Sequence, residues 1–326
     1  MVEYLMLRMP SANRVYGEQS GQLALAELAA TTDLVQDQRL HHIAGIEYVC
    51  CEAPELDADG LRRIAAQSSC FALFRHREDA LVPVQLPTPF VLDDDLVTIP
   101  KYPGKTNEHF TQLLLNVTLA AITRPAQGPR RILDPMAGRG TTLSTALRAG
   151  HHGFGIERDA KALDAMVAFY KTYLRRRRIK HSVQVAALRR DGVNLGRRFT
   201  GTVTTSAGEL SLESMTGDAT ASRELYGKKK FDAIVTDAPY GVEHAATAGG
   251  HRDRSPAQLL RAAIPVWSGQ LVHGGALGIS WNTFGLTRDD LAEIITGAGL
   301  SVLDQGGFSH RVDSSIRRDL IVATKP

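Results

Sequence analysis

The sequence predicts an α/β protein in which a Rossmann-like parallel sheet follows a small α+β domain. Beyond residue 95, apolar strand-like runs alternate with helical patterns, as in a parallel sheet with right-handed crossovers. Residues 131–143 contain a short apolar strand that runs into a glycine loop and then a helix. Because the 326 residues exceed one ordinary domain of ~100 to 200 residues, we expect two domains.

The first 95 residues predict a ferredoxin-like α+β unit. Asp57 is placed to cap the second of its two helices, since a side-chain oxygen there can accept from free helix amides. The expected elements are a strand at 3–7, a helix at 16–30, a strand at 46–50, a helix around 61–66 and a strand or edge segment at 70–75.

Three prolines mark the end of this unit. Pro83, Pro87 and Pro89 fall within residues 82–89, and proline can continue neither a helix nor a central strand because it lacks an N–H. This stretch is therefore interpreted as a linker. With a boundary near residue 95, the predicted domains are residues 1–95 and 96–326.

Composition places the chain among globular proteins. It is 43% hydrophobic and 22% charged, and no segment reaches the ~18 to 20 apolar residues of a membrane span. The start lacks a basic region followed by an apolar run, so a cytoplasmic location without membrane contact is expected. Cys50, Cys51 and Cys70 have neither zinc-site spacing nor an even count, and buried thiols are the expectation.

Charge is divided unevenly along the chain. Residues 1–100 carry 7 Arg against 15 Asp and Glu, which leaves 31 basic and 20 acidic residues for the remainder. A basic C-terminal part favours a polyanionic substrate, whereas the acidic N-terminal part would not attract phosphates.

The glycine loop predicts a cofactor site. Gly138 and Gly140 allow a tight turn and close approach of a ligand, and the following helix offers free amides. Glu157 ends the next strand, 19 residues after Gly138, where a Rossmann-like unit presents an acid to ribose. Neither a Gly-Lys-Ser/Thr motif nor a complete Gly-x-Gly-x-x-Gly is present, so a nucleoside without a pyrophosphate is expected.

A second polar turn follows the buried strand at 231–236. Asp237 and the Ala238 carbonyl can accept hydrogens from an exocyclic amine, whose lone pair is otherwise delocalised into a nucleobase ring. Tyr240 can stack on a base, and Gly241 leaves room beside it. The alternative is that Asp237 only caps a turn and Tyr240 is a half-buried aromatic residue.

Together, the Asp134-to-Thr142 loop and the Asp237-Ala238-Pro239-Tyr240-Gly241 turn resemble the amino-methyltransferases that act on nucleobases. The closing segment 309–318 and the small N-terminal domain look most like the tRNA guanine-N2 methyltransferases, whose larger members carry a THUMP domain. The resemblance implies a class I methyltransferase sheet that binds S-adenosylmethionine and releases S-adenosylhomocysteine. Two positions depart from the family: its Asp-Pro-Pro-Tyr has Ala238, and its aromatic residue after Asp-Pro is Met136.

The resemblance also implies residue roles. Ribose is expected on Glu157, adenine near Asp218 and Ala219, and the methionine end near the glycine loop, with residues 101–107 beside it or serving only as the loop before a helix at Glu108. The catalytic residues are expected to be Asp237, Ala238, Pro239 and Tyr240. The expected cofactor-binding residues are Thr106, Asp134, Pro135, Met136, Ala137, Gly138, Gly140, Thr141, Thr142, Glu157, Asp218, Ala219 and Asp237.

Basic residues gather between 171 and 198. This segment contains four consecutive arginines, which indicate either contact with RNA or a solvated helix end. Residues 200–213 predict a hairpin, and residues 243–256 predict a lid or a surface loop, in which His244 and His251 have no metal-site partners. The expected substrate-binding residues are Tyr240, Gly241, Arg175, Arg176, Arg177, Arg178 and Arg311.

The function predicted is methyl transfer to an exocyclic amine of a nucleobase in RNA, with guanine N2 in tRNA favoured and no metal required. One alternative is a DNA adenine-N6 or cytosine-N4 methyltransferase, which must flip its base from a duplex. Another is a non-catalytic protein that binds S-adenosylmethionine and RNA. The sequence gives no oligomeric state.

Overall fold

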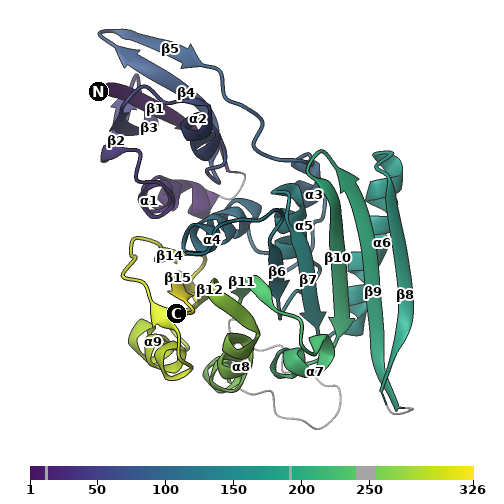
Figure 1. Cartoon of the computed structure of the whole chain (residues 1–326). Coiled ribbons are helices and arrows are strands. Elements are labelled where there is room, and N and C mark those ends of the chain that lie inside the picture. Colours follow the sequence, from purple (N-terminus) through teal and green to yellow (C-terminus); the bar gives the residue numbers. More distant parts are fainter. Residues whose placement is uncertain (12–13, 191–192, 240–254) are drawn as a thin grey trace.

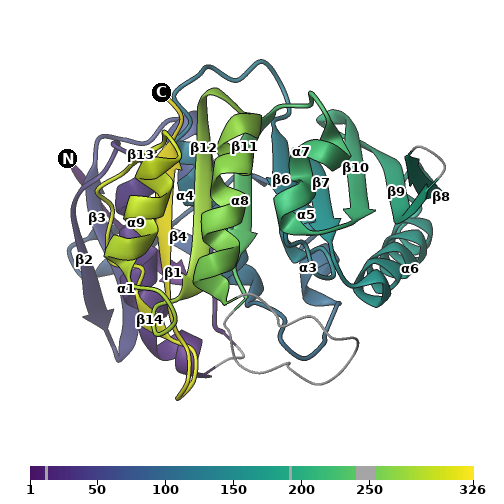
Figure 2. The same cartoon turned by 90° about the horizontal axis from the view of Figure 1, so that it is seen from below.

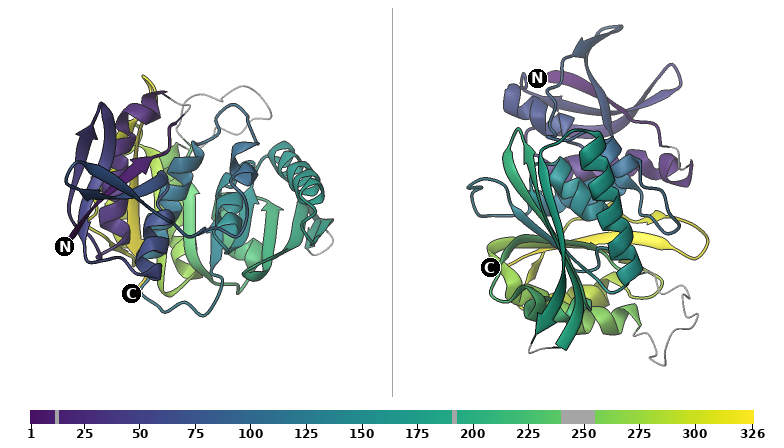
Figure 3. Two further views of the ribbon diagram at one scale, coloured as in Figure 1. Left: turned by 90° about the horizontal axis from the view of Figure 1, so that it is seen from above. Right: turned by 90° about the vertical axis from the view of Figure 1, so that its right-hand side faces the viewer.

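The chain folds around two β-sheets that lie side by side (Figure 1). The computed structural model describes residues 1–11, 14–190, 193–239 and 255–326. The N-terminal sheet lies at the end of the molecule remote from helix α6 and the β8–β9 hairpin (Figure 3, left).

The N-terminal sheet is antiparallel, with the strand order β2-β3-β1-β4-β5. Without β5, this is the βαββαβ arrangement of ferredoxin-like folds. Asp57 caps α2 as predicted and accepts a hydrogen bond from the Gly60 N–H at 2.8 Å. The elements are β1 (Val2–Arg8), α1 (Arg14–Thr31), β2 (Gln36–Ile43), β3 (Ile46–Ala53), α2 (Ala58–Ala65), β4 (Cys70–Arg77) and β5 (Ala80–Val84).

Two features of this sheet differ from expectation. Strand β2 was not predicted, because its polar sequence lies on a sheet edge and alternates little in hydrophobicity. The predicted linker begins too early, since residues 82–84 belong to β5. Pro83 lies opposite Phe74 on this edge strand, a position where proline is tolerated.

The larger sheet has the order β13-β15-β12-β11-β6-β7-β10-β9-β8. Five neighbouring strands are parallel, and β15 runs antiparallel between β12 and β13. This is a Rossmann-like α/β sheet, and the predicted fold class is confirmed. The parallel strands are β10 (Gly208–Thr216), β7 (His152–Glu157), β6 (Arg131–Asp134), β11 (Phe231–Asp237) and β12 (Leu271–Asn282).

The sheet is extended at both ends. On one side, β15 (Arg317–Thr324) pairs with β13 (Ser301–Val302) and β14 (His310–Arg311). On the other, β8 (His181–Arg190) and β9 (Val193–Thr205) form an added hairpin. The hairpin predicted at 200–213 is confirmed as the β9–β10 turn, although β10 belongs to the parallel core rather than to an insertion.

Helices cover both faces of the large sheet. One face carries α7 (Ser222–Tyr226), α8 (Pro256–Gln270) and α9 (Arg288–Gly297), which Figure 2 shows side by side. The other carries α4 (Glu108–Ala120), α5 (Thr141–Arg148) and α6 (Ala160–Arg176). Two short elements complete the chain, namely α3 (Asp95–Thr98) and the 3-10 helix η1 (Ala219–Ala221). No helix among the described residues is long and apolar enough to cross a membrane.

Helix α1 packs against both sheets. Its Leu23 lies in one core with Phe110 of α4, whereas its Leu28 lies in another with Tyr4 of β1. Gln19, near the start of α1, donates to the Arg311 carbonyl at 2.9 Å and accepts from the Arg311 N–H at 2.8 Å. The division into residues 1–95 and 96–326 therefore stays a prediction, since one helix serves two cores.

A buried carboxyl lies between the sheets. Glu27 of α1 is fully buried and accepts from the Ser68 N–H at 2.9 Å, the Ser68 hydroxyl at 2.5 Å and the Asn116 amide at 2.7 Å. Burial raises its pKa from 4.5 to about 7, against the lowering effect of these hydrogen bonds. The folded protein therefore holds this proton more tightly than the unfolded chain.

This raised pKa predicts a stability that falls as pH rises. The contribution of Glu27 is fully present below pH 4.5, is lost between pH 4.5 and about 7, and amounts to about 3 kcal/mol. Glu27→Gln keeps a neutral amide in place of the carboxyl, so its unfolding free energy should decline less between pH 5 and 8 than that of wild type. Urea unfolding at each pH measures both proteins, and equal declines would contradict the assignment.

The three cysteines are thiols with little exposure, as predicted. Cys50 and Cys51 are buried, Cys70 is partly buried, and all three are free thiols. Burial raises the pKa of each thiol to about 12, so none is activated as a nucleophile. Among the described residues, no group of three or more His, Cys, Asp or Glu could hold a metal ion.

Candidate active site

Three neighbouring parallel strands end in a carboxylate. Asp134 closes β6, Glu157 closes β7 and Asp237 closes β11. Strand β6 lies between β7 and β11, so the strand order reverses beside β6. Open α/β sheets bind ligands at the carboxyl ends of the strands where the order reverses. The structure thus brings the two predicted turns to one edge.

The glycine loop has the conformation that its sequence predicts. Gly138 and Gly140 have φ angles of +54° and +85°, and α5 begins at Thr141. The Ala137 N–H donates to the Ile156 carbonyl at 2.9 Å, which ties the loop to β7. A Cβ at Gly138 would meet no described atom within 4 Å, so the loop presents an open face there.

Asp134, at the end of β6, accepts a hydrogen bond from the backbone of the glycine loop. Its Oδ1 accepts from the Met136 N–H at 3.0 Å and from the Thr236 hydroxyl at 2.7 Å, and only 3% of the residue is exposed. Burial raises the pKa of this carboxyl to about 6. Asp134 therefore fixes the backbone that a ligand would contact.

Glu157 holds the loop from the neighbouring strand. Its Oε2 accepts from the Gly138 N–H and its Oε1 from the Asp159 N–H, both at 2.7 Å. Burial raises its pKa despite these bonds. The carboxylate thus lies beside the open face of the glycine loop.

Asp218 and Ala219 follow β10, the strand next to β7. Asp218 caps η1 by accepting from the Thr220 N–H at 2.9 Å. The Ala219 carbonyl accepts from the Trp267 indole at 2.9 Å. The predicted adenine position therefore shares the sheet edge with Glu157.

Asp237 is held by side chains from three separate segments. The hydroxyls of Thr106 and Ser280 both donate to its carboxylate, and Arg318 Nη2 lies 3.6 Å from Oδ2. Thr106 was predicted to lie at the site, but Ser280 and Arg318 were not. Ser280 could be found only from the strand register, in which it lies opposite Asp237 on β12.

The rest of this turn is partly described. The Ala238 N–H donates to the Ser280 carbonyl at 2.8 Å, Ala238 is buried and Pro239 is exposed. Tyr240 and Gly241, together with His244, His251 and most of the predicted lid, lie outside the described residues.

Residues 101–107 form a loop beside the glycine loop. The Tyr102 hydroxyl lies 2.8 Å from that of Thr141, and the Arg139 guanidinium lies 4.8 Å from the centre of the Tyr102 ring. Asn107 caps α4 by accepting from the Phe110 N–H at 3.3 Å. This segment therefore both opens a helix and reaches the site.

The four consecutive arginines do not reach this edge. Arg175–Arg178 are exposed at the far end of α6, which starts just after Glu157 and spans roughly 25 Å. Arg177 there lies 3.2 Å from Asp95. The structure therefore supports the solvated helix end and does not place these arginines near Asp237.

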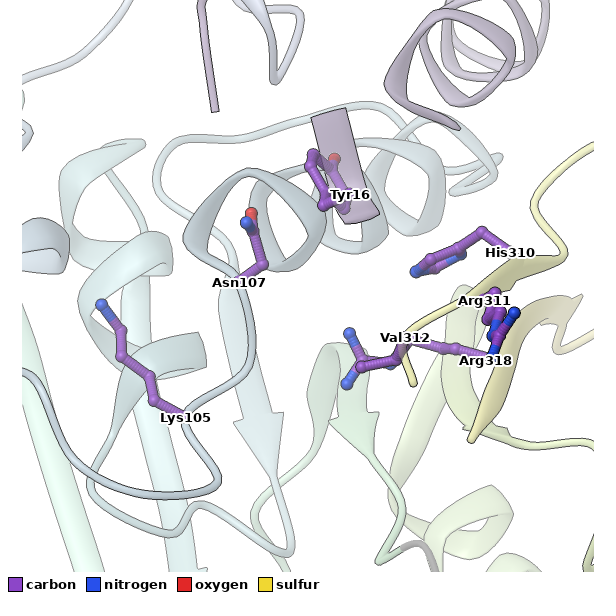
Figure 4. Close-up of a pocket in the computed structure, with 7 residues that line it drawn as sticks. All are labelled: Tyr16, Lys105, Asn107, His310, Arg311, Val312 and Arg318. Carbon is purple, nitrogen blue, oxygen red and sulfur yellow. The ribbon is translucent and has the colours of Figure 1, made fainter. Parts of the chain in front are cut away.

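A cavity of about 60 Å³ has Arg318 in its wall, and Nη2 of the same Arg318 lies 3.6 Å from Oδ2 of Asp237 (Figure 4). Arg311, another predicted substrate residue, lies in its wall. The lining residues are Tyr16, Lys105, Asn107, His310, Arg311, Val312 and Arg318.

No protein-family model matches the sequence, and no curated protein matches it. Among solved structures, the 16S rRNA N2 G1207 methyltransferase of T. thermophilus is 17% identical, with 90% of this chain and 59% of that chain covered and a TM-score of 0.40. A TehB-like SAM-dependent methyltransferase of Corynebacterium glutamicum is 15% identical, with 62% and 83% covered and a TM-score of 0.38.

The magnesium protoporphyrin IX methyltransferase of Synechocystis PCC 6803 is 13% identical, with 69% of this chain and 87% of that chain covered and a TM-score of 0.41. The three proteins are named for different substrates, and none of these substrates is assigned to the present chain. The fold class of this chain therefore stands on its own strand order and direction.

Proposed function

We propose that this protein is an S-adenosylmethionine-dependent methyltransferase that acts on an exocyclic amine of a nucleobase in RNA, with guanine N2 in tRNA as the favoured substrate. One observation carries the proposal: Asp237, oriented by Thr106 and Ser280, lies at the same sheet edge as the glycine loop and Glu157. A carboxylate that can accept a proton thereby lies at the sheet edge where the cofactor is proposed to bind.

The cofactor is proposed to lie across the ends of β6, β7 and β10. Its methionine end would contact the open face at Gly138, its ribose hydroxyls would bind Glu157, and its adenine would lie near Asp218 and Ala219. The ribose hydroxyls donate well to a carboxylate, and no described feature of the loop resembles a pyrophosphate cradle.

The proposed reaction is in-line displacement at the methyl carbon. The amine lone pair forms the new N–C bond while the C–S bond breaks, and its electrons stay on sulfur to give S-adenosylhomocysteine. Asp237 accepts a hydrogen bond from the amine and can take the proton that the methylated nitrogen loses. Alignment of the two reactants at ~3 to 3.5 Å supplies much of the rate.

A nucleic acid is proposed because residues 101–326 carry 31 basic against 20 acidic residues, which suits a polyanionic substrate. RNA is proposed ahead of DNA because the glycine loop and the Asp237 turn resemble those of the tRNA guanine-N2 methyltransferases. The retained carboxylate of Asp237 favours an enzyme over a protein that only binds the cofactor. A cytoplasmic location is part of the same proposal.

The test is methyl transfer from labelled S-adenosylmethionine to tRNA and to genomic DNA, both from a strain that lacks this gene. Label in tRNA supports the proposal, and nucleoside analysis then identifies the methylated base and its position. Label in DNA alone would support the adenine-N6 or cytosine-N4 alternative. Cofactor binding without transfer to either nucleic acid would support the non-catalytic alternative.

A further inference from the structure

Among the residues that line the cavity, His310 and Arg318 offer opposite kinds of hydrogen-bonding group, an acceptor and donors. His310 of β14 and Arg318 of β15 lie opposite each other in the strand register. Figure 4 shows the His310 ring directed toward the side on which Tyr16 and Asn107 lie. A volume of about 60 Å³ holds several waters, so the polar edge of a ligand can enter it.

His310 presents a hydrogen-bond acceptor. Its Nδ1 lies 2.9 Å from the Phe308 carbonyl, which can only accept, so Nδ1 carries the proton. Burial lowers the pKa of the ring to about 4, which keeps it neutral, and Nε2 therefore has a lone pair. This atom is buried and has no hydrogen-bond partner within the described part of the chain.

The ring of His310 is fixed by its neighbours. It packs against Phe110 at 4.8 Å and against Tyr16 at 6.0 Å between ring centres, and only 3% of the residue is exposed. Burial of an acceptor that has no hydrogen-bond donor lowers the stability of the fold, and a ligand that supplies a donor to Nε2 would remove this cost.

Arg318 presents donors next to this acceptor. Its guanidinium lies over the Phe110 ring at 4.9 Å and within 3.6 Å of Asp237, and 4% of the residue is exposed. Because a guanidinium has no acceptor, it can pair only with a lone pair or an anion. The cavity wall thus contains an acceptor on His310 and donors on Arg318, and Arg318 connects this wall to the Asp237 carboxylate.

We propose that His310 and Arg318 select guanine, with His310 Nε2 accepting from the ring N1–H, Arg318 donating to O6 and Asp237 binding the 2-amine. This inference rests on the proposed function and names the side chains that select its favoured base. Among the bases with an exocyclic amine, guanine alone has a ring N–H next to that amine. Adenine and cytosine present a lone pair there, which would face the lone pair of His310.

The experiment compares two synthetic RNAs that carry guanosine or 2-aminopurine at the position mapped in tRNA. 2-Aminopurine keeps the 2-amine but has a lone pair at N1. Wild type should prefer guanosine by about 100-fold in kcat/KM, since the analogue leaves buried polar groups unpaired. His310→Gln can turn its amide to donate instead, so the preference should fall by about tenfold or more.

His151→Gln is the matched control. His151 is a partly buried histidine, with its Nδ1 accepting from the Arg130 N–H at 3.3 Å, but it precedes β7 at the opposite edge of the sheet. Its substitution should leave the preference unchanged.

The outcomes separate the two proposals. Wild-type transfer to guanosine RNA with an unchanged preference in His310→Gln would overturn the role of His310 while the proposed function stands. Mapping of the methyl group to adenine or cytosine would overturn guanine selection alone. No transfer to any RNA by wild type would overturn both.

Discussion

Asp237→Asn should reduce kcat for methyl transfer by about 10²- to 10⁴-fold, the usual contribution of a positioned proton acceptor. The amide keeps the shape of the carboxylate but loses its charge and one acceptor atom. One of the hydroxyls of Thr106 and Ser280 can still donate to the remaining oxygen, and the other can accept from the new amide nitrogen, so the fold should persist. Single-turnover transfer of labelled methyl to tRNA measures the loss, and calorimetry should show a much smaller change in S-adenosylmethionine affinity.

Asp232→Asn is the control on the same strand. Asp232 lies at the other end of β11, where it accepts from the Arg131 N–H at 2.9 Å and lies 3.8 Å from Arg124. This substitution should lower stability but leave the rate per folded molecule intact. Equal rate losses in both variants, or full activity in Asp237→Asn, would remove Asp237 from the reaction.

Glu157→Ala should weaken S-adenosylmethionine binding by about 100-fold. In the proposed complex the carboxylate accepts from two ribose hydroxyls, and hydrogen bonds to a charged group contribute about 1.5 to 3 kcal/mol each. The substitution also frees the Gly138 N–H that Glu157 now binds, which loosens the glycine loop. Isothermal calorimetry with S-adenosylhomocysteine avoids turnover and should show the same loss.

Asp159→Ala is the neighbouring control. Asp159 caps α6 by accepting from the Lys161 N–H at 2.8 Å and is exposed. Its loss should cost about 1 kcal/mol of stability without changing cofactor affinity. If Glu157→Ala bound the cofactor as tightly as Asp159→Ala does, the ribose would lie elsewhere.

The sequence predicted those parts of the site whose residues lie close together along the chain. The glycine loop, the acid at the end of β7 and the helix at Glu108 follow from spacing and turn chemistry alone. The partners of Asp237 could not be predicted in this way. Ser280 reaches it through the parallel register, and Arg318 through a strand 81 residues later that inserts between two others.

The arginine run shows how little a charge cluster says about its distance from a site. Arg175–Arg178 form the most conspicuous charge cluster in the sequence, but helix length carries them away from the edge where the carboxylates meet. Periodicity fixes which face of a helix is apolar, whereas the distance of its end from a site depends on direction and length. Strand β2 was missed for a related reason, since its edge position leaves little hydrophobic pattern.

Gln19 and Tyr16 of helix α1 connect the N-terminal part of the chain to the cavity in which the base is proposed to bind. Two of the hydrogen bonds of the Gln19 amide go to the backbone of Arg311, next to His310, and Tyr16 forms part of the cavity wall. Removal of residues 1–95 would strip one wall from the cavity and would also take Leu23 from the core that it shares with Phe110. The choice of base and the packing of the large sheet would therefore both depend on helix α1.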